Sequence, residues 1–198
     1  MKVAIFDYGA GNLHSLAKAI ARAGAEVAIE PDPRAALDAD ALMLPGVGAF
    51  STAAARLAPG RDEVREAIER GHPCLGICLG MQLLFEGSDE GPGAGLAVLA
   101  GRVSRLRARR VPQIGWNAIE EPRDARFERA ALATAYFANG YVCRPDDHSV
   151  VVAWSTHEGD RFPAAVCRGR TLGVQFHPEK SSNPGLALIA AFLEEVAR

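Results

Sequence analysis

The stretch that decides the fold is CLGICLGMQLLF, residues 74–85, where a short apolar run gives way to a helical pattern around one cysteine. Residues 74–77 have the composition of a buried strand, and residues 79–85 are predicted to form a helix. Cys78 lies between them, with Gly76 and Gly80 two residues to either side, so the pattern is G-x-C-x-G. A strand, a sharp turn and a helix in this order are typical of a nucleophile elbow.

Two interpretations of Cys78 follow from this pattern. In the first, the turn lifts the thiol above the carboxyl edge of a sheet, where the start of a helix favours the thiolate and the N–H of Leu79 faces a developing oxyanion. In the second, Cys78 is a buried thiol at the end of an apolar strand. The pentapeptide alone leaves the two interpretations equally open.

Strands and helices alternate on either side of this stretch. Before it, the pattern predicts strands at residues 2–7, 26–30 and 41–45 and helices at residues 13–23 and 61–71. After it, strands are predicted at residues 101–108, 115–119, 136–144, 149–155, 164–167 and 171–176, and a helix at 184–197. The alternation predicts an α/β three-layer sandwich with a mostly parallel sheet, helices on both faces and an added antiparallel portion, in which residues 164–176 form a hairpin.

Length, charge and cysteine usage narrow the class of protein. A chain of 198 residues favours a single domain, residues 1–198, and a net charge of −2 gives no general attraction to nucleic acid or a membrane surface. The N-terminus has no signal-peptide pattern, and no apolar run approaches the roughly 20 residues that span a bilayer. Four cysteines without a CxxC pair favour reduced thiols, so we expect a cytoplasmic protein.

A cysteine nucleophile needs a base, and His177 is the best candidate. It follows the predicted strand TLGVQF, at the sheet edge where ligands of parallel sheets bind, and Glu179 follows two residues later. The carboxylate of Glu179 would orient the imidazole and stabilise its cation. The other histidines are predicted to be solvated: His14, His72, His148 and His157.

A third loop at a strand end is LPGVGAF, residues 44–50. Its glycines, Gly46 and Gly48, allow backbone N–H groups to face a bound carbonyl, which would complete an oxyanion hole. Taken alone, a G-x-G favours a plain turn.

Taken together and in this order, PGVGAF, GICLGMQ and QFHPEKS resemble the motifs of the class I, triad-type glutamine amidotransferases, over residues 44–182. The resemblance implies that Cys78 attacks the carboxamide of L-glutamine, that His177 transfers the proton and that Glu179 supports it. A glutamyl thioester would form, ammonia would leave and water would release glutamate. The resemblance implies an oxyanion hole from Val47, Gly48 and Leu79, and neither a cofactor nor a metal.

The same resemblance assigns substrate contacts. They are the loop residue Gly46 with its neighbours, the side chains of Gln82 and Glu90, and the backbone at Gly140 and Tyr141. The family usually has His-Ser or His-Thr before the tyrosine, where this chain has Asn139 and Gly140. This departure leaves backbone contacts possible and removes any hydroxyl contact at position 140.

Further motifs are similar to one branch of the family, in which the glutaminase is a separate chain: DYGAGNL, PQIGWN, FEGSDEGPGAGL and HPEKS. That branch implies a heterodimer with a (β/α)₈ cyclase barrel of histidine biosynthesis, which receives the ammonia. The positions implied near the interface are Asn12, Trp116, Tyr136 and Lys180. Two alternatives remain: a glutaminase subunit serving anthranilate or pyridoxal phosphate synthesis, and a non-catalytic flavodoxin-like binding module.

Overall fold

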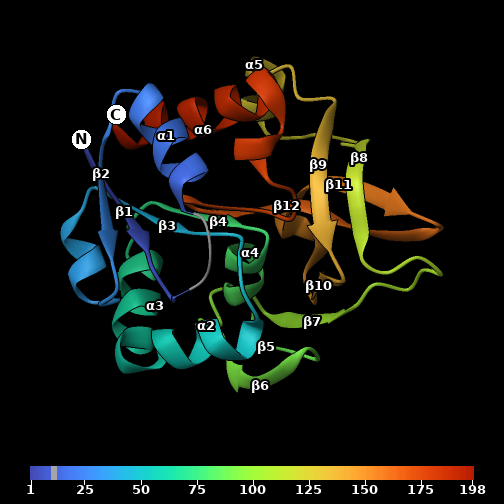
Figure 1. The fold of residues 1–198 in the computed structure, drawn as a ribbon, viewed down its shortest axis with the longest axis horizontal. Coiled ribbons are helices and arrows are strands. Elements are labelled where there is room, and N and C mark those ends of the chain that lie inside the picture. The colour runs from blue at the N-terminus through green and yellow to red at the C-terminus, as the bar shows by residue number, and fades with distance from the viewer. Residues whose placement is uncertain (10–12) are drawn as a thin grey trace.

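The computed structural model describes residues 1–9 and 13–198, and its central feature is a mixed sheet with helices on both faces (Figure 1). The strand order is β11-β12-β13-β4-β3-β1-β2. The strands are β1 (Lys2–Phe6), β2 (Glu26–Glu30), β3 (Ala41–Leu44), β4 (Cys74–Ile77), β11 (Val151–His157), β12 (Asp160–Arg168) and β13 (Thr171–Val174). The predicted fold class, α/β with an added antiparallel portion, is confirmed.

The sheet is parallel from β2 to β13 and antiparallel at its other edge. β13 pairs in parallel with β4, and β12 pairs antiparallel with both β13 and β11. The carboxyl ends of β3, β4 and β13 therefore lie side by side, which brings the loops that follow Leu44, Ile77 and Val174 to one edge.

Side chains along β1 point alternately to the two faces of the sheet, and each face packs against one layer of helices. Val3 and Ile5 belong to one buried apolar cluster, while Ala4 and Phe6 belong to the other. The first cluster is covered by α1 (His14–Arg22), α5 (Ala125–Arg129) and α6 (Ser182–Val196). The second is covered by α2 (Phe50–Leu57), α3 (Arg61–Glu69) and α4 (Leu79–Leu83).

Two smaller sheets flank the carboxyl edge. One has the order β10-β7-β5-β6, with β5 (Gly87–Ser88), β6 (Gly91–Ala94), β7 (Gly101–Arg105) and β10 (Tyr141–Pro145). The other pairs β8 (Gln113–Ala118) with β9 (Thr134–Asn139).

The predicted strand at residues 136–144 is wrong as a single element. The chain runs in β9 up to Asn139, changes sheets at Gly140, and continues in β10. The carbonyl of Gly140 accepts the N–H of Leu106 at 2.9 Å, so Gly140 is already hydrogen-bonded to the segment that follows β7. Sequence period does not reveal the change, because both strands are apolar.

The predicted strand at 101–108 is too long, since β7 ends at Arg105. Beyond it, the N–H groups of Arg107 and Arg109 donate to the carboxylates of Asp160 and Glu158 instead of to a neighbouring strand. The helix α2, in the Ala-rich segment after the PGVG loop, was not predicted.

Candidate functional site

Cys78 occupies a strained turn between β4 and α4. Its φ and ψ are 49° and −102°, in a region that residues other than glycine rarely adopt. Its N–H donates to the carbonyl of Val174 at 2.6 Å, and its own carbonyl accepts the N–H of Gln82 at 3.1 Å. The thiol is 6% exposed and lies at the carboxyl edge of the sheet, as an elbow requires.

The two glycines of G-x-C-x-G are required by close packing. A Cβ on Gly80 would come within 1.9 Å of the carbonyl oxygen of Leu44, at the end of β3. A Cβ on Gly76 would come within 2.7 Å of the backbone of Gly80 itself. Only glycine at both positions lets the helix start directly against the sheet.

His177 and Glu179 follow the neighbouring strand β13. The imidazole Nδ1–H donates to Oε1 of Glu179 at 2.8 Å, and both side chains are nearly buried. The backbone is fixed on both sides of His177: its N–H donates to the carbonyl of Tyr136, and its carbonyl accepts the hydroxyl of Ser181 at 2.7 Å. With Nδ1 held by the carboxylate, Nε2 is the nitrogen left to serve a reacting group.

The electrostatics favour a protonated His177. Burial lowers the pKa of the imidazole, but hydrogen bonds to Cys78 and Glu179 outweigh it and raise the pKa to about 9. A cation at this position stabilises negative charge on the adjacent sulfur. The imidazolium of His177 is therefore placed beside the sulfur of the candidate nucleophile.

The PGVG loop lies directly above the pair. A Cβ on Gly46 would come within 2.8 Å of Cε1 of His177 and 3.0 Å of Cβ of Cys78. Gly48 has φ of +111°, a conformation that favours glycine. The loop backbone can approach a bound carbonyl here because neither glycine carries a side chain.

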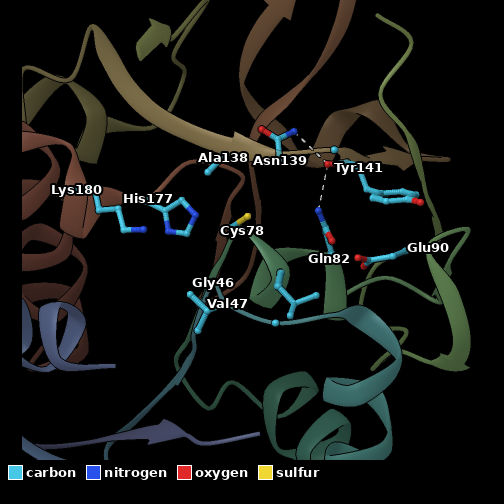
Figure 2. A pocket seen from close by; sticks show the side chains of 13 residues that line it. Gly46, Val47, Cys78, Gln82, Glu90, Ala138, Asn139, Tyr141, His177 and Lys180 are labelled. Atoms are coloured by element: carbon cyan, nitrogen blue, oxygen red, sulfur yellow. Dashed lines mark hydrogen bonds between the residues drawn. The ribbon is translucent and has the colours of Figure 1, made fainter. Parts of the chain in front are cut away.

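One cavity of about 300 Å³ joins these elements (Figure 2). Its lining contains eleven of the residues singled out in the sequence: Gly46, Val47, Gly48, Cys78, Leu79, Gln82, Glu90, Gly140, Tyr141, His177 and Lys180. Figure 2 shows the ring of His177 on one side of the Cys78 sulfur and the side chains of Gln82 and Glu90 on the other. The structure thus brings together residues that lie up to 134 positions apart in the chain, from Gly46 to Lys180.

Glu90 has a structural contact as well as a place in the cavity. Its Oε2 accepts the N–H of Phe50, the first residue of α2, at 3.1 Å. The helix α2 begins just after the PGVG loop, so one carboxylate contacts both the cavity and the segment that carries the loop.

The other positions implied by the resemblance lie beside the cavity or outside the described residues. Trp116 and Tyr136 face each other across β8 and β9, with ring centroids 6.4 Å apart, and Trp116 is 55% exposed. Ile114, two residues away on the same face, is 67% exposed and was not singled out. Asn12 lies outside the described residues.

Sequence reasoning also missed two buried amides. Asn139 lines the cavity, and its Nδ2 donates to the carbonyl of Tyr141 at 3.1 Å. Gln175 is fully buried, and its Nε2 donates to the sulfur of Cys78 at 3.5 Å. Gln175 opens the motif QFHPEKS, but nothing in that motif indicates that its amide contacts Cys78.

Within the described residues, 1–9 and 13–198, no cluster of His, Cys, Asp or Glu is arranged to hold a metal ion. In the same part of the chain, no helix is long and apolar enough to cross a membrane.

Comparison with known proteins identifies the family of this chain. The family model for glutamine amidotransferase class-I matches residues 4–196, so the chain belongs to the class-I glutamine amidotransferases. Among curated relatives, the imidazole glycerol phosphate synthase subunit HisH of Symbiobacterium thermophilum is 47% identical over 196 residues, covering 96% of this chain and 92% of that protein. The HisH subunit of Thermus thermophilus is 45% identical and covers 96% of each chain.

Solved structures give the same fold. A crystal structure of a glutamine amidotransferase superposes with a TM-score of 0.75 at 26% identity, covering 99% of both chains. The structure of PurLQS from Thermotoga maritima superposes with a TM-score of 0.70 at 21% identity, covering 98% of both chains, and shows the fold alone.

Proposed function

We propose that this chain is the glutaminase subunit of an imidazole glycerol phosphate synthase, acting in histidine biosynthesis. The observation that carries the proposal is that Cys78 and His177 line one cavity and Glu179 holds the imidazole of His177, in a chain 47% identical to a subunit of that synthase. Its substrate is L-glutamine, and its products are glutamate and ammonia.

Glutamine binds with its carboxamide over Cys78. The acidic side chain of Glu90 pairs with the α-ammonium of glutamine. The Nε2 of Gln82 donates to the carbonyl of Tyr141 at 3.2 Å, so its Oε1 is left to accept a hydrogen bond from the substrate. The α-carboxylate lies along the backbone at Gly140 and Tyr141. No hydroxyl at position 140 is needed for this placement.

The first half of the reaction forms a thioester. The thiolate of Cys78 attacks the carboxamide carbon, and the negative charge that develops on oxygen is stabilised by the N–H groups of the loop at Val47 and Gly48 and of Leu79. The imidazolium of His177 gives its proton to the leaving nitrogen, so the C–N bond breaks and ammonia departs.

The second half releases glutamate. Neutral His177 takes a proton from water, and the oxygen attacks the thioester carbon. When the C–S bond breaks, the thiolate and the imidazolium are restored. Glu179 holds the tautomer and the orientation of His177 throughout.

The proposed partner is a (β/α)₈ barrel, the cyclase subunit, which forms a heterodimer with this chain. The aromatic face of β8 and β9 supports this placement, because Ile114 and Trp116 are exposed there. Lys180 lines the cavity. Ammonia would cross at Trp116, Tyr136 and Lys180. A nucleophilic thiol must stay reduced, which supports a cytoplasmic location.

The proposal is tested with Cys78→Ala in the complex with the cyclase. We expect glutamine-driven product formation to fall by at least about 10³-fold, because the nucleophile is gone. Added ammonium salt should still support the cyclase at the wild-type rate, which controls for folding and assembly. Glutamine-driven turnover by Cys78→Ala would overturn the assignment of Cys78 as the nucleophile. If the chain bound the synthase of another pathway and not this cyclase, the proposed role in histidine biosynthesis would be wrong.

A further inference from the structure

A chain of buried amides ends on the sulfur of Cys78. It begins at the carbonyl of Tyr141, which accepts Nε2 of Gln82 at 3.2 Å. The same nitrogen donates to Oε1 of Gln175 at 3.4 Å, and Nε2 of Gln175 then donates to Sγ of Cys78 at 3.5 Å. Gln82 is 4% exposed and Gln175 is fully buried, so water does not compete for these groups.

The chemistry of the groups fixes the direction of every bond in this chain. A backbone carbonyl only accepts, so Gln82 must present its NH₂ group to Tyr141. The second hydrogen of that NH₂ group requires an acceptor, so Gln175 must present its oxygen to Gln82. The nitrogen of Gln175 is then the end that faces Cys78, and an amide NH₂ can only donate.

The backbone holds Gln175 in place. It directly follows β13, and its N–H donates to the carbonyl of Ala164 on β12 at 2.9 Å. Figure 2 shows the amide nitrogen of Gln82 turned towards the backbone carbonyl of Tyr141, with its oxygen on the opposite side. The donor on Cys78 is therefore set before any substrate arrives.

We propose that Gln175 is a positioning residue for the reaction, whose amide holds the sulfur of Cys78 as a hydrogen-bond acceptor and so favours the thiolate. A donor on sulfur stabilises the ionised form over the thiol, in which sulfur carries its own hydrogen. His177 provides a second favourable contact to the same thiol. Gln82 affects Cys78 indirectly, by fixing the orientation of the Gln175 amide, and it also contacts the substrate.

The inference deepens the proposed function, because it concerns the same nucleophile, but its test needs no glutamine. The full-length protein is treated with iodoacetamide from pH 5 to pH 9, and the rate of alkylation of the Cys78 peptide is followed by mass spectrometry. The midpoint of the rate profile reports thiolate formation, and its plateau at high pH reports access of the reagent. Cys143 and Cys167 lie on separate tryptic peptides, whereas Cys74 shares the peptide of Cys78 and is distinguished from it by fragmentation of that peptide.

Gln175→Met removes the donor and keeps the size of the side chain. We expect a profile moved up by about one pH unit, with a roughly tenfold lower rate on its acidic limb and the plateau unchanged. The matched control is Gln113→Met, the same replacement at a buried glutamine of β8 that does not line the cavity. This control should alkylate like the wild type.

Gln82→Met keeps the inference testable if Gln175→Met does not fold. It removes the group that fixes the orientation of the Gln175 amide, and we expect a smaller shift in the same direction. A wild-type profile in the variants, or an equal shift in Gln113→Met, would overturn the inference. The proposed function would fail separately, if Cys78→Ala kept its glutamine-driven turnover.

Discussion

At the scale of the residue, the reactivity of the site is set by what contacts Cys78 and His177. The carboxylate of Glu179 fixes one nitrogen of the imidazole at 2.8 Å, and the strained backbone of Cys78 directs the thiol away from the strand. Ser181 holds the same loop, since its hydroxyl donates to His177 and accepts the N–H of Tyr136. Glu179 and Ser181 thus hold His177 through contacts that do not involve Cys78.

Glu179→Gln should shift the alkaline limit of activity. Hydrogen bonds to Cys78 and Glu179 raise the pKa of His177 to about 9, so removing the charge at position 179 should lower that pKa. His177 would then lose the proton needed by departing ammonia at a lower pH, and kcat should begin to fall earlier on the alkaline side. The measurement is the pH profile of glutamine hydrolysis in the complex.

Ionisation of the substrate cancels in this comparison, because both proteins hydrolyse the same glutamine. An alkaline limit that stays in place, or moves up, would show that Glu179 does not support the proton on His177.

The sequence is informative about residues that stand in local motifs, and less so about those that act through the fold. Cys78, His177 and the PGVG loop could be singled out because each follows an apolar strand and has unusual neighbours. The contact of Gln175 with Cys78 has no such signal, since it depends on burial and on a partner 97 residues away. The roles of all these residues stay predictions until they are tested.

At the scale of the element, the elbow depends on how closely α4 approaches β3. The alternating pattern and the central parallel strands could be predicted, because apolar period and glycine position determine them locally. The split of residues 136–144 between two sheets could not, because it depends on which neighbours the two strands find. The start of α2 depends in the same way on a carboxylate 40 residues away, in Glu90.

Gly80→Ala should destabilise the fold by at least about 2 kcal/mol, because its Cβ would overlap the carbonyl oxygen of Leu44 and force α4 away from the sheet. The free energy of unfolding, measured in urea, checks this. Gly140→Ala is the control, since the nearest atom to its Cβ would be at an ordinary 3.4 Å. Equal stability of the two variants would mean that the close contact at Gly80 is not needed.

Glu90→Ala should weaken the start of α2. The carboxylate accepts the N–H of Phe50 and lies at the positive end of the helix, an effect of about 0.5–1 kcal/mol. Because α2 follows the PGVG loop, we expect kcat to fall as well as KM to rise. An effect on KM alone would limit Glu90 to binding the α-ammonium of glutamine.

At the scale of the whole molecule, the aromatic face of β8 and β9 is joined to the cavity through Tyr136, whose carbonyl accepts the N–H of His177. A bound cyclase would cover Ile114 and Trp116 and contact the segment that holds His177, because the N–H of His177 donates to the carbonyl of Tyr136 on β9. This arrangement predicts that the partner affects the catalytic geometry.

The isolated chain should therefore hydrolyse glutamine slowly, and addition of the cyclase should raise the rate by at least about tenfold. Trp116→Ala should raise the concentration of cyclase at which glutamine hydrolysis is half-maximally activated. A full rate in the absence of any partner would contradict this prediction.

The most direct test of the central claim, that Cys78 is a nucleophile for glutamine, is covalent labelling by 6-diazo-5-oxo-L-norleucine, an electrophilic analogue of glutamine. With the cyclase present, we predict one adduct per chain, located on the peptide that contains Cys78, and protection by L-glutamine. An unlabelled Cys78, or labelling that glutamine does not slow, would contradict the account.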